Sequence, residues 1–277
     1  MPPIREVIAR YGLRTRKHLG QHFLHDGNLC ARIVRAAGPL EDASVIEVGP
    51  GPGGLTRALL ASPARAVIAI ERDTRCIAAL GPLVEAAGGR LEVVAADALE
   101  VDATLLAARP RAVVANLPYN LATPLLVRWL ETIAADAAAF RSLTLMVQKE
   151  VAERIAAPPG TRAYGRLSVL AQWLCEVRRA FDVPARAFTP PPKVTSTVVR
   201  LDPRPCPSHP AEAGALQRVC KAAFGQRRKM LRTSLKGLGL DAAALLAAAA
   251  VAGNLRAEQL DIGQFCALAR ALEAAKH

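Results

Sequence analysis

Along residues 1–205, short apolar runs alternate with stretches in which apolar residues recur at helical spacing. The short runs predict buried strands, and the longer periodic stretches predict helices. Strands that alternate with helices form parallel β-α-β units, so an α/β domain with a doubly wound sheet is expected. The predicted strands are 45–48, 66–70, 91–96, 112–115, 143–147, 177–183 and 195–201. The predicted helices are 29–37, one that ends near 61, 74–87, 102–108, 124–135, 150–157 and 165–175.

Two proline-rich segments interrupt this pattern. Residues 188–193 lie between the last two predicted strands, and their three consecutive prolines predict a rigid loop that is neither strand nor helix. Residues 202–213 predict a joint between two domains. The residues beyond this joint are almost entirely helical in pattern. Domains are therefore expected at 1–205 and 206–277, the second of them small and all-helical.

The tetrapeptide Asn116-Leu117-Pro118-Tyr119 directly follows the predicted strand 112–115. Pro118 has no backbone N–H and favours an extended conformation at Leu117, so the strand ends here. The Leu117 carbonyl and the Asn116 amide oxygen can then face one pocket, with the Tyr119 ring beside them. The alternative interpretation is an ordinary proline turn at a strand end.

A pocket of this kind suits chemistry on the exocyclic amine of adenine. The N6 lone pair is delocalised into the ring, and two oxygen acceptors that hold the N–H groups favour a pyramidal, nucleophilic nitrogen. An aromatic face holds the base by stacking. No general base is needed before attack, because the methylated nitrogen is cationic and loses its proton afterwards. Asn116, Leu117 and Tyr119 are the predicted catalytic residues.

A glycine-rich turn at 49–54 joins the first predicted strand to its helix and satisfies both G-x-G-x-x-G and G-x-G-x-G. Gly49 and Gly51 allow close approach of the backbone to a ligand, and Glu71 ends the next strand, where a carboxylate accepts from ribose hydroxyls. The pattern predicts a nucleoside cofactor and leaves NAD and S-adenosylmethionine open. Asp97, at the end of the third strand, either accepts from the cofactor's adenine amine or caps a helix.

The predicted topology distinguishes the two cofactors. Ligands of a doubly wound sheet bind outside the carboxyl ends of the strands, where the winding direction reverses. The glycine turn ends the first strand and Asn116 ends the fourth, and these strands are neighbours across that point in the usual winding. An S-adenosyl methyl donor uses this arrangement directly, whereas a nicotinamide cofactor would give residues 116–119 no role in the reaction.

Composition narrows the choice of partners. The 277 residues carry a net charge of +12, and the pI is about 10.0, which favours a polyanion. Hydrophobic residues make up 52% and charged residues 22%, as in a globular protein. The six cysteines lack metal-ligand spacing and are predicted to be small buried residues in a reducing compartment. No signal peptide or membrane-spanning run is found, so a cytoplasmic protein without metal or membrane partner is expected.

The strongest local charge signal lies at 218–236, which holds seven basic residues and no acid. On a single helix, six of the seven share a face about 100° wide, and apolar residues take the opposite side. Gly225 can divide the stretch into two helices. A solvated face is the alternative, but the lack of an acid favours phosphate contact. The predicted RNA-binding residues are Lys221, Arg227, Arg228, Lys229 and Arg232.

Several motifs together make the chain similar to the small-subunit rRNA adenine N6,N6-dimethyltransferases, the KsgA family. The resemblance runs from residue 19 to the C-terminus. The matching motifs are Leu19-Gly20-Gln21-His22-Phe23-Leu24, Glu47-Val48-Gly49-Pro50-Gly51, Asn116-Leu117-Pro118-Tyr119, Val147-Gln148-Lys149-Glu150-Val151-Ala152, Phe188-Thr189-Pro190-Pro191-Pro192-Lys193-Val194 and Ala223-Phe224-Gly225-Gln226-Arg227-Arg228-Lys229.

The resemblance implies a Rossmann-like S-adenosylmethionine-dependent methyltransferase fold with a small helical C-terminal domain. It implies four methyl transfers in all, to two adjacent adenosines in a hairpin near the 3′ end of small-subunit rRNA. The immature small subunit is then the expected partner, bound by a monomer through the basic second domain and the basic N-terminal segment. The implied cofactor contacts are His22, Leu24, Gly49, Glu71, Asp97 and Asn116.

Two positions and two rival functions stay open on sequence alone. The family often has Asn where this chain has His22, which leaves the contact at this position undecided. Phe188 is predicted to close the base pocket opposite Tyr119, with a core aromatic as the alternative. The nearest rival function is the related large-subunit rRNA dimethylase that confers antibiotic resistance. A mainly non-catalytic ribosome assembly factor is the other.

Overall fold

The computed structural model describes residues 1–13 and 22–275, which form two compact units. The sheet unit comprises Met1–Trp129, Ala138–Ala152 and Arg178–Pro203; the helical unit comprises Leu130–Ala137, Glu153–Val177 and Arg204–His277. The last of these boundaries falls within two residues of the expected joint at 205/206. The helical unit also includes two earlier segments. One of them contains helix α8 (Arg166–Leu174), which packs against α9 (Ala213–Gly225) and α12 (Ile262–Ala274).

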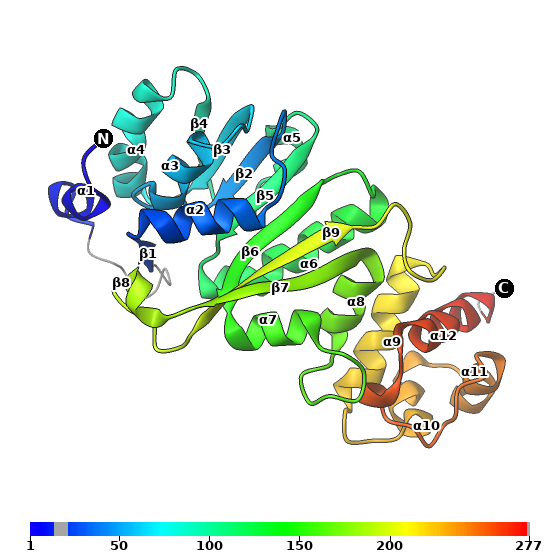
Figure 1. The fold of residues 1–277 in the computed structure, drawn as a ribbon. Coiled ribbons are helices and arrows are strands. Elements are labelled where there is room, and N and C mark those ends of the chain that lie inside the picture. Colours follow the sequence, from blue (N-terminus) through cyan, green and yellow to red (C-terminus); the bar gives the residue numbers. More distant parts are fainter. Residues whose placement is uncertain (14–21, 276–277) are drawn as a thin grey trace. The chain divides into compact units, whose positions relative to one another are not determined.

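The sheet has seven strands in the order β4-β3-β2-β5-β6-β9-β7 (Figure 1). The first five strands of this order pair in parallel, and β9 pairs antiparallel with β6. Strand β2 lies between β3 on one side and β5 on the other, so the winding reverses beside β2, as predicted. The strands are β2 (Ser44–Val48), β3 (Ala66–Glu71), β4 (Leu91–Ala95), β5 (Arg111–Asn116), β6 (Ser142–Gln148), β7 (Cys175–Val183) and β9 (Ser196–Pro203).

Helices follow the strands of the sheet unit, and aspartates begin several of them. Asp26, Asp73 and Asp102 each accept a backbone N–H in the first turn of the adjoining helix, which satisfies donors left unpaired by the helix. The helices that contribute residues to this unit are α2 (Gly27–Ala36), α3 (Gly54–Leu60), α4 (Thr74–Ala86), α5 (Ala103–Leu106), α6 (Tyr119–Ala135) and α7 (Lys149–Ala156). Each agrees with a predicted helix.

Helix α6 begins at Tyr119, five residues before the predicted start at 124. Pro124 lies inside the helix. The N–H groups of Leu121 and Ala122 already donate to the Pro118 carbonyl, so the first turn forms directly behind the strand. This early start places Tyr119 on a helix rather than in a loop.

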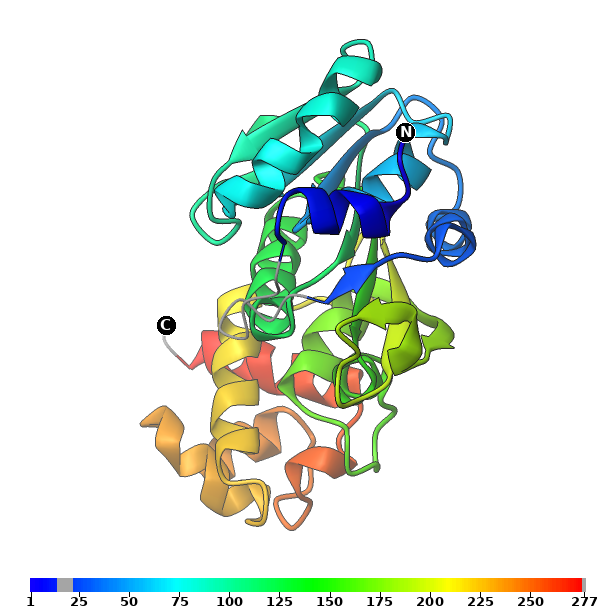
Figure 2. The same ribbon diagram turned by 90° about the vertical axis from the view of Figure 1, so that its left-hand side faces the viewer.

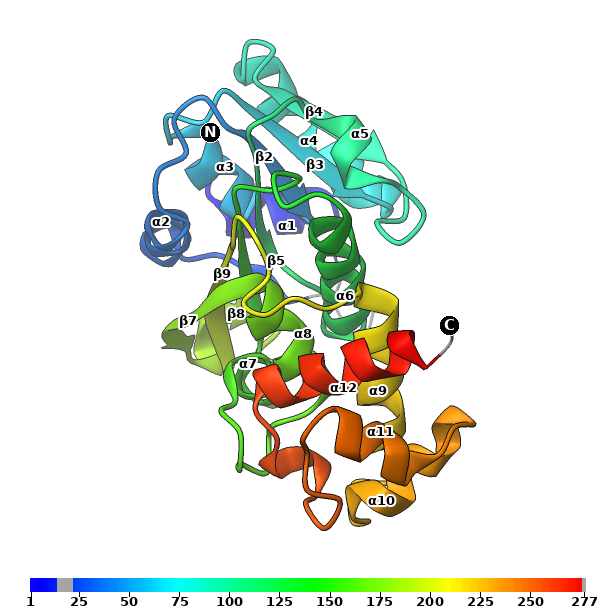
Figure 3. The same cartoon turned by 90° about the vertical axis from the view of Figure 1, so that its right-hand side faces the viewer.

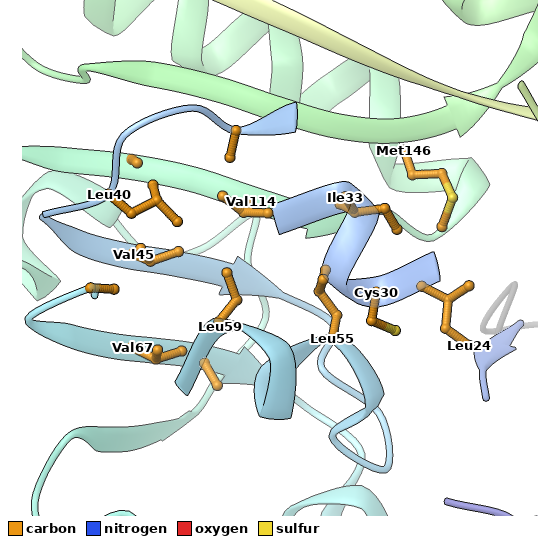
Figure 4. Close-up of a cluster of buried hydrophobic side chains, with 14 of the residues drawn as sticks. Leu24, Cys30, Ile33, Leu40, Val45, Leu55, Leu59, Val67, Val114 and Met146 are labelled. Carbon is orange, nitrogen blue, oxygen red and sulfur yellow. The ribbon is translucent and has the colours of Figure 1, made fainter. Parts of the chain in front are cut away.

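The core of the sheet unit forms where α2 and α3 cover one face of the sheet (Figure 4). Leu55 and Leu59 of α3 and Ile33 of α2 pack against inward-facing strand residues such as Val45 and Val114, all nearly inaccessible to water. Burial of this apolar surface, at about 25 cal/mol per Å², holds the strand ends in register for the site.

A short helix and a two-stranded ribbon, neither of them predicted, flank the glycine turn. Helix α1 (Ile4–Arg10), seen in the foreground of Figure 2, packs through Val7 in a cluster with Phe23, Cys76 and Ala79. Strand β1 (Phe23–Leu24) pairs antiparallel with β8 (Phe188–Thr189). The prediction that 188–193 contains no strand is therefore wrong for its first two residues, which can pair because they precede the prolines.

In the helical unit, α9 and α12 pack against each other (Figure 3). Phe224 stacks on Phe265 with ring centroids 5.4 Å apart, and Tyr164 meets Phe224 edge-on at 6.0 Å. The apolar residues predicted opposite the basic face are Leu216, Val219, Ala223, Phe224, Leu231 and Leu235. Phe224 is half-buried and the other five are buried. The remaining elements are α10 (Leu231–Ser234), η3 (Leu235–Leu238), α11 (Ala242–Ala248) and η4 (Ala257–Gln259).

The expected single basic helix face at 218–236 does not exist, because α9 ends at Gly225. Arg228 and Lys229 lie in the next turn, and Arg232 and Lys236 belong to the short elements after it. The division at Gly225 is confirmed. Burial of every cysteine is wrong for Cys206, which is exposed, whereas the other five are buried and all six are free thiols.

Over residues 1–13 and 22–275, no helix is long and apolar enough to cross a bilayer.

Candidate active site

A cavity lies at the carboxyl ends of four neighbouring strands. Residues that end or closely follow these strands line it: Gly49 after β2, Glu71 at the end of β3, Asp97 two residues after β4, and Asn116 at the end of β5. Strands β2 and β5 pair directly through 44–46 and 111–113. The prediction that the glycine turn and Asn116 meet at the switch point is confirmed.

The glycine turn needs glycine at Gly51 for two reasons. Its φ of 55° is in the left-handed region, and a Cβ there would lie 2.9 Å from the Phe23 ring. The turn therefore exposes main-chain atoms to the cavity. Phe23 lies next to the turn, where it packs against residues of α1 and α4. This surface fits a ligand that contacts main-chain atoms.

Glu71 is buried, and its carboxylate accepts three backbone N–H groups. Oε2 accepts from Gly51 at 3.2 Å, and Oε1 accepts from Arg72 and Asp73 at 2.9 Å each. Burial raises the pKa of this carboxyl above its ordinary value, while the three N–H groups act in the opposite direction. A carboxylate has about four lone-pair positions, so acceptor capacity remains for a hydroxyl of a ligand in the cavity.

Asp97 is held by a turn and by an arginine. Oδ1 accepts from the Leu99 N–H at 3.0 Å, and Oδ2 pairs with the Arg72 guanidinium at 2.7 Å. The Leu99 bond, followed by Arg72, lowers the pKa of Asp97. Asp97 does not cap a helix, because α5 begins at Ala103 and its cap is Asp102. Asp97 caps a turn and lines the cavity.

Asn116 is oriented by the main chain of the β1 segment. Its Nδ2 donates to the His22 carbonyl oxygen at 3.1 Å, so the amide oxygen is the end left for the cavity. The Leu117 N–H donates to the Met146 carbonyl at 3.2 Å. Among the described residues, no protein group donates to the Leu117 carbonyl oxygen. Consecutive residues at the end of β5 thus present two oxygen acceptors to which no group of residues 1–13 and 22–275 donates.

The Tyr119 ring is positioned by Ser196. The two hydroxyl groups lie 2.9 Å apart, and Ser196 is itself fully buried at the start of β9. Partial burial raises the pKa of the Tyr119 phenol. The ring centroid is 5.3 Å from that of His22, whose Nδ1 lies 2.9 Å from the Pro190 carbonyl. Because a carbonyl only accepts, Nδ1 carries the proton in this contact.

Phe188 does not line the cavity that holds Tyr119. Its side chain is 2% exposed and belongs to the main hydrophobic cluster, and the His22 ring is its aromatic neighbour at 6.4 Å. Phe188 is therefore a core aromatic residue, which is the alternative to a place in the base pocket. His22 is the ring next to Tyr119, and neither it nor Ser196 was assigned to the base pocket from sequence. Both are far from 116–119 along the chain, and no local pattern marks them.

Glu47 also lines the cavity, and the sequence predicts no role for it beyond the motif at 47–51. It is 1% exposed at the end of β2, and its Oε2 has no hydrogen-bond partner. Burial raises its pKa from 4.5 to about 8. A carboxyl inside the apolar run 45–48 is the sequence signal, because such groups are rarely buried without function.

The predicted RNA-binding residues divide into free and paired cations. Lys221, Arg228, Lys229 and Arg232 are exposed. Arg227 lies 3.8 Å from Glu258 and donates to the Thr161 carbonyl at 3.2 Å. Glu273 also pairs with Arg218 at 2.9 Å. The expectation that no acid neutralises the basic residues of 218–236 is therefore wrong, because acids from elsewhere in the helical unit pair with two of them.

Part of one predicted motif lies outside the described residues. Leu19, Gly20, Gln21 and the basic positions at 14–17 fall in the undescribed segment, whereas His22, Phe23 and Leu24 lie beside the glycine turn. In the described parts of the chain, no group of His, Cys, Asp and Glu has the arrangement of a metal site.

The strand order and the glycine turn beside the Asn116 and Leu117 oxygens are those of an S-adenosylmethionine-dependent methyltransferase. Comparison with known proteins identifies the class more narrowly. The sequence matches the family "Ribosomal RNA adenine dimethylase" over residues 12–274, and the chain belongs to this family.

Individual relatives agree with this assignment. The chain is 59% identical to the ribosomal RNA small subunit methyltransferase A of Rhodospirillum rubrum, over 99% of this chain and 94% of that protein. It is 61% identical to the protein of the same name from Paramagnetospirillum magneticum, over 99% and 96%. Among solved structures, a dimethyladenosine transferase from Plasmodium falciparum has a TM-score of 0.75 at 26% identity, over 89% and 96% of the chains. The structure of the 23S rRNA methyltransferase ErmE has a TM-score of 0.68 at 29% identity, over 91% of this chain and 99% of that one.

Proposed function

We propose that this protein transfers methyl groups from S-adenosylmethionine to N6 of two adjacent adenosines in a hairpin near the 3′ end of small-subunit rRNA, during assembly of that subunit. The observation that carries the proposal is the pair of free acceptors at Asn116 and Leu117, placed beside the glycine turn. The relatives at 59% and 61% identity, named for the small subunit, support that choice of RNA.

The cavity fits S-adenosylmethionine on its own chemistry. Glu71 has acceptor capacity for ribose hydroxyls, and the bare backbone at Gly49 and Gly51 allows close approach. The unpartnered Oε2 of Glu47 suits a ligand with N–H donors. Asp97 would accept from the adenine amine, and His22 and Leu24 would line the same ligand. When bound, the cofactor supplies an electrophilic methyl group carried on a sulfonium.

The protein's part in the reaction is to hold the target amine. Asn116 Oδ1 and the Leu117 carbonyl would accept the two N6–H groups and thereby localise the nitrogen lone pair. Tyr119 would stack on the base, its ring held by the Ser196 hydroxyl. After one transfer N6 retains a single N–H, so one acceptor must tolerate a methyl group at the second transfer.

The basic residues would hold the rRNA. Lys221, Arg228, Lys229 and Arg232 are exposed and able to neutralise phosphates, whereas Arg227 would first have to leave Glu258. We expect a cytoplasmic monomer that acts on immature subunits.

The decisive experiment is incubation of the protein with labelled S-adenosylmethionine and, in parallel reactions, undermethylated small subunits and large subunits, followed by digestion and nucleoside analysis. Label in N6,N6-dimethyladenosine of small-subunit rRNA is the expected result. Label confined to large-subunit rRNA would favour the alternative, which the 29% identity to ErmE keeps as the second candidate. Subunit binding without methyl transfer would indicate an assembly factor.

A further inference from the structure

Next to the methyl-transfer cavity, the sheet unit has a second hollow, of about 540 Å³. It lies between the N-terminal part of α2 and the η2 turn (Ala185–Ala187) that leads into β8. We name it the arginine hollow, after Arg32, Arg35 and Arg186, which line it together with His25 and Asp26.

The arginine hollow is cationic. Its one lining carboxylate, Asp26, is engaged as the α2 cap, where Oδ1 accepts from the N–H groups of Asn28 and Leu29. In the described chain, none of the three guanidinium groups has a carboxylate within ion-pair distance. Arg72, Arg179 and Arg200 of the same unit all have one. The arginines of the hollow therefore have unused capacity for an anion.

Structural roles account for only part of this cluster. Arg32 lies over the Phe181 ring, with its guanidinium carbon 3.8 Å from the centroid, which holds that side chain in place. Arg35 is in the last turn of α2, where a cation is favoured by the helix dipole. Neither role applies to Arg186, which is exposed on a different element and still borders the same hollow.

The β1–β8 ribbon connects the hollow to the methyl-transfer cavity. Leu24 lines the cavity, and the next residue, His25, lines the hollow. On the partner strand Phe188 pairs with Leu24, and the preceding residue, Ala187, lines the hollow. An extended chain advances about 3.3 Å per residue, and phosphates in a nucleic-acid strand succeed each other every few ångströms. The hollow therefore begins within one residue of the cavity lining, so neighbouring phosphates of an RNA strand with its base in the cavity can reach it.

We propose that the arginine hollow binds backbone phosphates of the RNA strand immediately next to the target adenosine. This inference rests on the proposed function. Guanidinium groups bind phosphate oxygens in a bidentate manner, and phosphate contacts set register without reading sequence. The hollow would thereby place the correct nucleotide over the acceptor pair, while the basic helical unit supplies other contacts.

The test is an Arg35→Ala/Arg186→Ala double variant of the full chain, which keeps Arg32 on Phe181. Its affinity for undermethylated small subunits is measured against salt concentration. The expected result is a plot of log affinity against log salt that is shallower by about 1–2, with affinity lowered about tenfold. The control is Arg109→Ala/Arg141→Ala, which removes the same charge at the amino ends of β5 and β6 and should leave the slope unchanged.

A crosslinking experiment locates the contact. Arg186→p-benzoylphenylalanine is irradiated on the same subunits, and the adduct is mapped on the RNA. Adducts within a few nucleotides of the methylated adenosines support the proposal. Adducts elsewhere, or a double variant that matches its control in salt slope, overturn it. Failure of the unmodified protein to methylate adenosine would instead reject the proposed function, so the two failures are distinguishable.

Discussion

The Asn116 side-chain amide donates to the backbone carbonyl of His22 at 3.1 Å, across 94 positions of sequence. An amide side chain has two ends of nearly equal size, and its neighbours decide which end faces which group. Since a carbonyl accepts only, Nδ2 must face His22 and Oδ1 must face the cavity. The segment before α2 therefore orients the residue that is proposed to hold the target amine.

Replacing Asn116 by alanine tests the acceptor pair. Asn116→Ala removes Oδ1 and should lower the single-turnover rate of methyl transfer by about a hundredfold or more, the usual loss when one preorganised polar group is removed from a reacting centre. RNA affinity should persist, because the basic residues are intact. Asn254→Ala, in the helical unit, is the control. An unchanged transfer rate in Asn116→Ala would remove the site assignment.

Glu71 should act mainly on cofactor affinity. Glu71→Ala removes a charged acceptor and leaves the Gly51 N–H unpaired at the cavity. Hydrogen bonds to charged groups contribute about 1.5–3 kcal/mol, so binding of S-adenosylhomocysteine should weaken roughly 10- to 150-fold. Calorimetric titration measures this directly. Glu92→Ala, an exposed glutamate on β4, should bind normally; equal affinities in the two variants would refute the ribose role of Glu71.

Glu47 should make the stability of the protein depend on pH. Its pKa of about 8 in the folded protein exceeds the ordinary 4.5, so between these values the folded state holds a proton that the unfolded state has released. The stabilisation from that proton is complete below about pH 4.5 and is lost as the pH rises towards 8. The slope is about 1.4 kcal/mol per pH unit over this window.

Comparison with Glu47→Gln isolates this contribution from other titrating groups. The variant keeps a neutral side chain of the same shape, so the difference in free energy of unfolding between variant and unmodified protein should grow in the variant's favour from pH 5 to pH 8. Denaturant unfolding of the cofactor-free protein at several pH values provides the measurement. A difference that does not vary with pH would mean that Glu47 is ionised when folded.

Two helical glycines should respond in opposite directions to the same substitution. Gly81→Ala in α4 meets no atom within 4 Å and should stabilise the protein by about 0.5–1 kcal/mol. Gly54→Ala in α3 places a Cβ 2.5 Å from the Leu24 carbonyl oxygen and should destabilise it by about 1–3 kcal/mol. Chemical denaturation compares them. Equal stability of the two variants would contradict the close packing of β1 on the glycine turn.

The exposed and paired cations of the helical unit should differ in salt dependence. Arg228→Ala removes an exposed charge and should reduce the slope of log RNA affinity against log salt by about 1. Arg218→Ala removes a charge already paired with Glu273 and should change the slope much less. Filter binding over a range of salt concentrations separates the two. Equal reductions would show that the Glu273 pair opens when RNA binds.

Local sequence determined the elements of the sheet and the positions of Gly49, Glu71, Asp97 and Asn116 at strand ends. These features depend on short-range physics: apolar runs, proline without an N–H and glycine at positive φ. Their convergence resulted from the handed winding of parallel β-α-β units, which is a general property of such chains.

Only the tertiary structure decided which distant groups complete the site. The Asn116–His22 bond, the Ser196–Tyr119 contact and the edge-on contact of Phe188 with His22 all join segments that no periodicity relates. The same is true of Glu273 and Glu258, which pair with arginines of a stretch that contains no acid of its own. Pairing across the chain depends on how the elements pack, and residue spacing along a single element does not encode that packing.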